Sequence, residues 1–126
     1  MPDRILICDD CDEDVYLLSR SLTIGAISIQ SVRARDGEEA LQLLTEQTGF
    51  DLVIIDHRLP LKSGLEVLHD LRSAGKFPLC PVVVLTSRTG KEKEAMEALG
   101  VHSVLEKPIS LDGYREIGKY LAKLCG

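Results

Sequence analysis

Five polar residues have the side chains that a phosphoryl-transfer site needs, and each lies at the end of a short apolar segment. They are Asp9, Asp10, Asp56, Thr86 and Lys107. A carboxylate can attack phosphorus and form an aspartyl phosphate. Clustered carboxylates repel one another unless a cation neutralises them, and their hard oxygen atoms suit Mg²⁺. An ammonium group and a hydroxyl group could then hold the phosphoryl oxygens by charge and hydrogen bonding.

The apolar segments before these residues are predicted to be strands of a parallel sheet. They lack polar alternation, which is typical of strands covered on both faces. The predicted strands are 4–8, 27–32, 52–55, 82–85 and 103–105. Helical spacing of apolar residues predicts helices over 12–23, 38–47, a segment through Leu65 to Leu71, 91–99 and 111–124. Right-handed crossovers would cover both faces of the sheet, so the pattern predicts a (βα)5 domain of the α/β class.

The carboxyl ends of parallel strands lie at one edge of the sheet, where ligands of such folds bind. We therefore expect the five polar residues to meet there. Taken singly, each has a simpler interpretation: an aspartate at a strand end usually caps the next helix. Asp12 is expected to be such a cap, and Asp36 is expected to cap the second helix. The coincidence at four strand ends favours a functional site.

Composition restricts the class of protein. The 126 residues fit one domain, 1–126, with no output domain expected. The net charge of −5, from 15 basic and 20 acidic residues, argues against nucleic-acid binding. No apolar run approaches the roughly 18–20 residues that cross a bilayer, and the first apolar segment is too short for a signal peptide. We expect a cytoplasmic protein that binds neither nucleic acid nor membrane.

The chain resembles the receiver domains of two-component response regulators across nearly its whole length. The order and spacing of several motifs together carry this resemblance. The motifs are 7–10, 34–41, 56–60 with Gly64, 83–87, 98–100 and 107–108. The resemblance implies a flavodoxin-like, doubly wound parallel sheet with the strand order 2-1-3-4-5.

The resemblance also implies a role for each polar residue in phosphoryl transfer. Asp56 would accept a phosphoryl group from a phosphohistidine donor, which is a histidine kinase or a histidine phosphotransfer protein. Thr86 and Lys107 would contact that phosphoryl group, and Thr86 would move toward it on activation. The Lys107–Pro108 peptide bond is commonly cis in such domains, and the sequence permits this.

A magnesium site is the second implication of the resemblance. Asp10 would bind Mg²⁺ directly and Asp9 through a water molecule. Asp56 and the backbone carbonyl group of Arg58 would complete the protein ligands.

Three positions concern how the signal leaves the site and how long the phosphoryl group lasts. Many receivers have an aromatic ring three residues before the lysine, and this chain has Val104 there. A readout by movement of that ring is therefore in doubt. Arg58 and Arg88 occupy positions that tune phosphoryl lifetime in the family, and we hypothesise that they overhang Asp56 and alter the access of water.

The leading functional hypothesis is a phosphorylation-controlled signalling module that acts on an unknown protein target or passes the phosphoryl group onward. By resemblance, the target would bind the face formed by the fourth helix, fifth strand and fifth helix. The alternative is a receiver-like module that binds proteins without phosphorylation. No enzymatic activity is expected beyond self-catalysed gain and loss of the phosphoryl group, because a haloacid-dehalogenase-type phosphatase would need an aspartate where Arg58 stands.

A redox role is disfavoured by the residues around the one C-x-x-C motif. Cys8 and Cys11 have that spacing, but two aspartates lie between them. Negative neighbours disfavour the thiolate that such chemistry requires.

Overall fold

The chain alternates strand and helix five times, as the spacing of its apolar residues predicts. We describe a computed structural model of residues 3–25, 28–87, 90 and 92–125. The strands are β1 (Asp3–Cys8), β2 (Ile29–Ala34), β3 (Leu52–Asp56), β4 (Val82–Thr86) and β5 (Ser103–Glu106). The helices are α1 (Asp12–Gly25), α2 (Gly37–Glu46), α3 (Gly64–Ser73), α4 (Glu92–Leu99) and α5 (Leu111–Cys125). None of the described helices is long and apolar enough to cross a bilayer.

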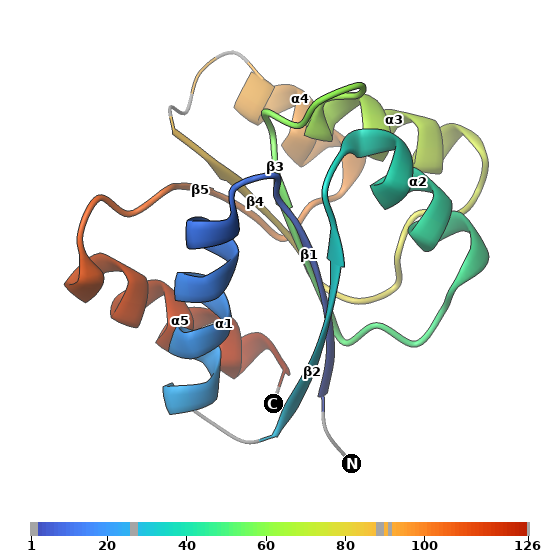
Figure 1. Ribbon diagram of the computed structural model, residues 1–126. Coiled ribbons are helices and arrows are strands. Elements are labelled where there is room, and N and C mark those ends of the chain that lie inside the picture. The colour runs from blue at the N-terminus through green and yellow to red at the C-terminus, as the bar shows by residue number, and fades with distance from the viewer. Residues whose placement is uncertain (1–2, 26–27, 88–89, 91, 126) are drawn as a thin grey trace.

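The five strands form one parallel sheet in the order β2-β1-β3-β4-β5, which confirms the predicted topology (Figure 1). Its register sets the level at which each strand ends. Cys8 of β1 pairs with Ile55 of β3, so the residues that follow them, Asp9 and Asp56, lie at the same level. Thr86 pairs with Glu106, directly before Lys107. The register therefore brings the predicted site residues to one edge.

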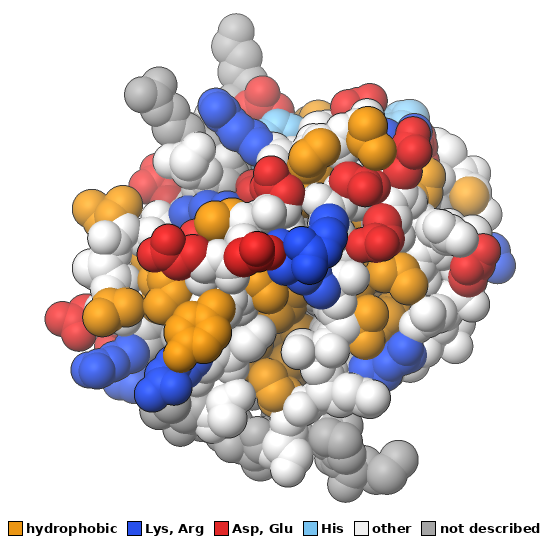
Figure 2. All heavy atoms as spheres, viewed as in Figure 1, with side chains coloured by type: hydrophobic (Ala, Val, Ile, Leu, Met, Phe, Trp, Pro, Cys, Tyr) orange, Lys and Arg blue, Asp and Glu red, His pale blue; other side chains and the backbone are white. Residues whose placement is uncertain are grey.

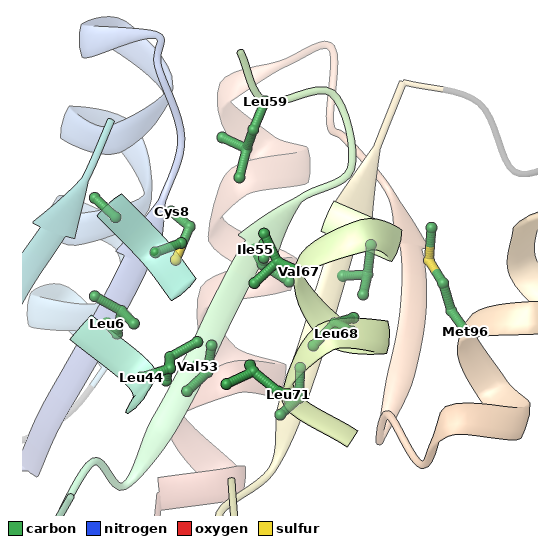
Figure 3. Packing of buried hydrophobic residues seen from close by; sticks show 14 of the residues in the cluster. Leu6, Cys8, Leu44, Val53, Ile55, Leu59, Val67, Leu68, Leu71 and Met96 are labelled. Atoms are coloured by element: carbon green, nitrogen blue, oxygen red, sulfur yellow. The ribbon is translucent and has the colours of Figure 1, made fainter. Parts of the chain in front are cut away.

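Helices cover both faces of the sheet and bury two separate apolar clusters. Side chains along a strand alternate between faces, so neighbouring residues of β3 enter different clusters. Val53 and Ile55 pack toward α2, α3 and α4 (Figure 3), and Leu52 and Ile54 pack toward α1 and α5. All five residues of β3 and of β4 are buried. Because helices cover both faces of the sheet, residues 52–55 of β3 and 82–85 of β4 are all apolar.

One of the two predicted helix caps is confirmed and the other is wrong. Asp36 caps α2, because its carboxylate accepts a hydrogen bond from the backbone N–H of Glu39 at 2.7 Å. Asp12 is instead the first residue of α1. Its carboxylate pairs with Arg33 at 2.6 Å and with Arg35 at 3.2 Å, since both guanidinium groups reach it from the end of β2 and the residue after it.

Helices α1 and α5 approach each other closely where α5 carries a glycine. A Cβ atom at Gly118 would lie 2.6 Å from the Cβ atom of Ser21 and 2.9 Å from its backbone carbonyl. Both positions are buried. A side chain at position 118 would therefore force the two helices apart.

We predict that Gly118→Ala lowers the free energy of unfolding by about 1–2 kcal/mol, because overpacking outweighs the gain in helix propensity. Urea unfolding followed by circular dichroism measures the change. Lys119→Ala is the matched control, since Lys119 is exposed on the same helix and its replacement should shift stability by no more than about 0.5 kcal/mol. A Gly118→Ala protein as stable as the wild type would show that the helices separate without cost.

Candidate functional site

The polar residues that follow four strands meet at one end of the sheet. Asp9, Asp10 and Asp56 each offer a carboxylate oxygen, and these oxygens lie within 4.8 Å of one another. The Nζ atom of Lys107 lies 2.9 Å from Oδ2 of Asp56 and 3.1 Å from Oδ2 of Asp9. Thr86 is buried at the end of β4, and its carbonyl group accepts a hydrogen bond from the backbone N–H of Lys107 at 2.7 Å. The structure thus brings together all five residues that the sequence singled out.

Asp56 is buried, with 6% of its surface exposed, and both of its carboxylate oxygens have donors. Oδ1 accepts the backbone N–H of Arg58 at 3.0 Å, and Oδ2 accepts the ammonium group of Lys107. The loop that follows is fixed by the backbone N–H of Gly64, which donates to the carbonyl group of His57 at 2.8 Å. A Cβ atom at Gly64 would lie 2.9 Å from the Asp56 carbonyl oxygen. This close approach explains the glycine eight residues after the aspartate.

Asp9 is the most deeply buried carboxylate of the site, with 2% of its surface exposed. Burial raises the pKa of Asp9 above its usual value. The hydrogen bond from the backbone N–H of Cys11, at 2.9 Å, and the charge of Lys107 offset this only in part. The ionised form is therefore held in the folded protein at a free-energy cost, which a bound cation would relieve.

A fourth carboxylate, Asp14 of α1, also contacts the lysine. Its Oδ2 lies 2.8 Å from Nζ of Lys107, and its Oδ1 accepts a hydrogen bond from the hydroxyl group of Tyr114 at 3.1 Å. Burial alone would lower the pKa of Lys107, but its hydrogen bonds to Asp14 and Asp56 outweigh burial and raise it. Burial would likewise raise the pKa of Asp14, but the hydrogen bond from Lys107 keeps it below its usual value. Burial and the neighbouring Asp14 raise the pKa of Tyr114 to about 12.

The contact between Asp14 and Lys107 could not be predicted from the sequence, for a physical reason. Asp14 belongs to a group of acidic residues at 9–14, and this concentration of negative charge is the only feature of the sequence that draws attention to it. Tyr114 lies on the buried face of α5, with 6% of its surface exposed. Which side chains of α1 face α5 depends on how the two helices pack, and spacing along the chain does not contain that information.

Arg33 is a second residue that the sequence did not single out. Its Nε and Nη2 atoms donate to the backbone carbonyl group of Asp9, both at 3.2 Å, and its Nη1 atom contacts Asp12. The guanidinium group thus ties the end of β2 to the loop that carries Asp9 and Asp10. Arg33 therefore holds this loop through a backbone carbonyl group rather than through the carboxylates of Asp9, Asp10 and Asp56.

Val104 is buried, and it lines a small cavity together with Thr86. The cavity there has a volume of about 10 Å³, which is no more than one water molecule needs. It is lined by His57, Thr86, Gly90, Glu92, Lys93, Met96 and Val104. Nδ1 of His57 is buried and has no hydrogen-bond partner among the described residues. A moving aromatic ring at position 104 is therefore not part of this site.

The remaining sequence predictions have different outcomes. No cis peptide bond occurs among the described residues, so the Lys107–Pro108 bond has the trans form, which X–Pro bonds usually prefer. The side chain of Arg58 is exposed, and Arg88 lies outside the described residues. Their effect on phosphoryl lifetime stays a prediction, as does the metal contact of the Arg58 carbonyl group.

The environment of Cys8 argues against redox chemistry. The thiol is fully buried in β1, and burial, reinforced by the charge of Asp9, raises its pKa. Cys11 is exposed, and all four cysteines are free. A buried thiol with a raised pKa is inert, in agreement with the sequence analysis.

Comparison with known proteins finds one family over most of the chain. The family model of the response regulator receiver domain matches residues 5–117. Response regulator MprA of Mycolicibacterium vanbaalenii is 38% identical over 113 residues, which are 89% of this chain but 47% of MprA. The chain therefore spans about half the length of that relative. The polar-differentiation response regulator DivK of Brucella anthropi is 34% identical over 123 residues, which are 96% of this chain and 98% of DivK.

Solved structures show the same fold. The Mn²⁺-bound form of response regulator Rcp1 superposes with a TM-score of 0.82 at 28% identity, over 94% of this chain and 91% of Rcp1. The chemotaxis protein CheY4 of Vibrio cholerae has a TM-score of 0.75 at 24% identity, over 96% of this chain and 99% of CheY4, and supports the fold alone.

We predict that Asp9→Asn stabilises the protein at neutral pH in the absence of divalent cations. Because folding raises the pKa of Asp9, the contribution of this carboxyl group to the free energy of unfolding falls as the pH rises past 3.8 and stays lower above the folded-state pKa. Asparagine removes this penalty. Urea unfolding with a chelator present, at neutral pH and near pH 4, measures the difference, which should shrink at the lower pH. Asp112→Asn on exposed α5 is the control, and an Asp9→Asn protein less stable than the wild type would contradict the prediction.

Proposed function

The chain belongs to the response regulator receiver family, and on that premise we propose that Asp56 accepts a phosphoryl group from a phosphohistidine donor in a Mg²⁺-dependent reaction. One observation carries the proposal. The buried Asp56 carboxylate lies 2.9 Å from the Lys107 ammonium group and within 4.8 Å of two further carboxylates. A nucleophile, a cation site and a fixed positive charge are thus combined in one pocket.

In the proposed reaction, a carboxylate oxygen of Asp56 forms a bond to phosphorus while the bond between phosphorus and the donor's imidazole nitrogen breaks. The electron pair of the broken bond stays on the imidazole, which is released as neutral histidine once it carries a proton. Asp56 needs no general base because its carboxylate is already the nucleophile. Lys107 would stabilise the charge on the phosphoryl oxygens, and the hydroxyl group of Thr86 would donate a hydrogen bond to one of them.

The residues present fit a magnesium ion. Asp9, Asp10 and Asp56 supply hard oxygen ligands from three positions, and the burial cost at Asp9 is of the kind that a cation offsets. The bound ion would neutralise charge on the phosphoryl group as it approaches the carboxylates. The Mn²⁺-bound form of Rcp1 supports a divalent cation in a related protein.

The partners follow from the same proposal. The donor would be a histidine kinase or a histidine phosphotransfer protein, and the output would be contact with a protein target or onward phosphotransfer. We place this activity in the cytoplasm and propose no enzymatic activity beyond self-catalysed phosphorylation and dephosphorylation of Asp56.

Incubation with acetyl phosphate and Mg²⁺ tests the proposal by intact-protein mass spectrometry. We expect the wild type to gain about 80 Da, the mass of one phosphoryl group. Asp56→Asn and a chelator should each abolish the gain, and Lys107→Met should reduce it at least roughly ten-fold, because one lost charge contact raises the barrier by more than about 1.4 kcal/mol. Asp112→Asn, far more exposed, should behave as the wild type.

The outcomes separate two functions. A gain that depends on Asp56 supports phosphoryl acceptance. The absence of any gain in the wild type, with both a small-molecule donor and a phosphorylated histidine phosphotransfer protein, would favour the phosphorylation-independent binding module.

A further inference from the structure

The ammonium group of Lys107 has three hydrogen-bond donors and three carboxylate partners. Its Nζ atom lies 3.1 Å from Asp9, 2.8 Å from Asp14 and 2.9 Å from Asp56. Asp9 and Asp56 belong to the cluster that could hold a cation, whereas Asp14 does not. One of the three contacts therefore anchors the lysine outside the proposed metal site.

Lys107 and a divalent cation would compete for the same carboxylates, Asp9 and Asp56. Both are positive, so they repel each other at short distance, and the repulsion is stronger in a partly buried pocket than in water. The side chain of Lys107 is only 17% exposed, so solvent screens it little. A cation can bind tightly only if the ammonium group keeps a partner elsewhere.

The position and contacts of Asp14 suit it to be that partner. The hydroxyl group of Tyr114 donates to Oδ1 at 3.1 Å, which leaves Oδ2 directed at Lys107. Tyr114 is itself buried between the sheet and α1, so the carboxylate is held by both α1 and α5. With Asp14 and Lys107 counted as a neutral pair, three carboxylates remain to face a cation.

We propose that Asp14 is a positioning residue that draws the Lys107 ammonium group away from Asp9 and Asp56 and thereby strengthens cation binding. This inference rests on the proposed function, since it assumes that those carboxylates bind Mg²⁺. It assigns Asp14 and Tyr114 a role that acts only through Lys107.

Asp12 provides a matched control on the same helix. It carries the same charge two residues before Asp14, but its side chain is 80% exposed and pairs with Arg33 and Arg35. Asp14 is 23% exposed and pairs with Lys107. Removing either charge changes the net charge of the protein equally, so the comparison controls for net charge.

The experiment measures the dissociation constant for Mg²⁺ alone, by calorimetry or by titration of backbone amide resonances. We expect Asp14→Asn to weaken binding on the order of five-fold, and Tyr114→Phe to weaken it about two-fold, because the loss of one charge or one hydrogen bond in a partly exposed pocket has this size. Asp12→Asn should leave the constant within about 1.5-fold of the wild type. Thermal unfolding of each variant confirms that it is folded.

A double-mutant cycle with Lys107→Met completes the test. Lys107→Met alone should strengthen Mg²⁺ binding, and in that background Asp14→Asn should have no more effect than Asp12→Asn. The inference is overturned if Asp14→Asn binds Mg²⁺ as tightly as the wild type, or if it weakens binding equally with and without the lysine. A wild type that binds no Mg²⁺ at all would instead overturn the Mg²⁺ dependence in the proposed function, and the inference with it.

Discussion

The site depends on the neutralisation of carboxylates that folding has removed from water. Asp9 and Asp56 are almost fully buried, and charged groups in such places must be paired. In this structure the Lys107 ammonium group pairs with both of them and with Asp14. The fold tolerates this arrangement because buried apolar clusters on both faces of the sheet supply the stability that the charged end does not.

The same constraint explains where the charged groups lie. In a parallel sheet covered on both faces, polar groups can collect only at the ends of the strands, and the register decides which of them meet. Acidic side chains accordingly gather in the upper part of Figure 2, toward the end of the molecule at which the strands end in Figure 1. The backbone contact between Lys107 and Thr86 joins the ends of β5 and β4, so the ammonium and hydroxyl groups are held as one unit.

The sequence was sufficient for the fold and for the residues at the strand ends, because both depend on periodicity along the chain. Apolar runs without alternation indicated buried strands, and the residue after each run was necessarily at the sheet edge. The contact between Asp14 and Tyr114, 100 residues apart, could not be predicted in this way. It depends on the packing of α1 against α5, which Gly118 permits, and Arg33 likewise reaches Asp9 only because β2 lies beside β1.

The buried Val104 changes what can carry a signal away from Asp56. Valine is β-branched and has no ring that could exchange positions, and the cavity that it lines with Thr86 has a volume of only about 10 Å³. Groups that touch the site and also reach other elements include the backbone of Thr86 and Lys107, which joins β4 to β5. The side chain of Lys107 reaches α1 through Asp14, whose carboxylate in turn contacts Tyr114 of α5. Arg33 of β2 contacts the carbonyl group of Asp9. Because a phosphoryl group would add nearly two negative charges beside the Lys107 ammonium group, the three hydrogen bonds of that group, including the one to Asp14 of α1, lie where the added charge acts.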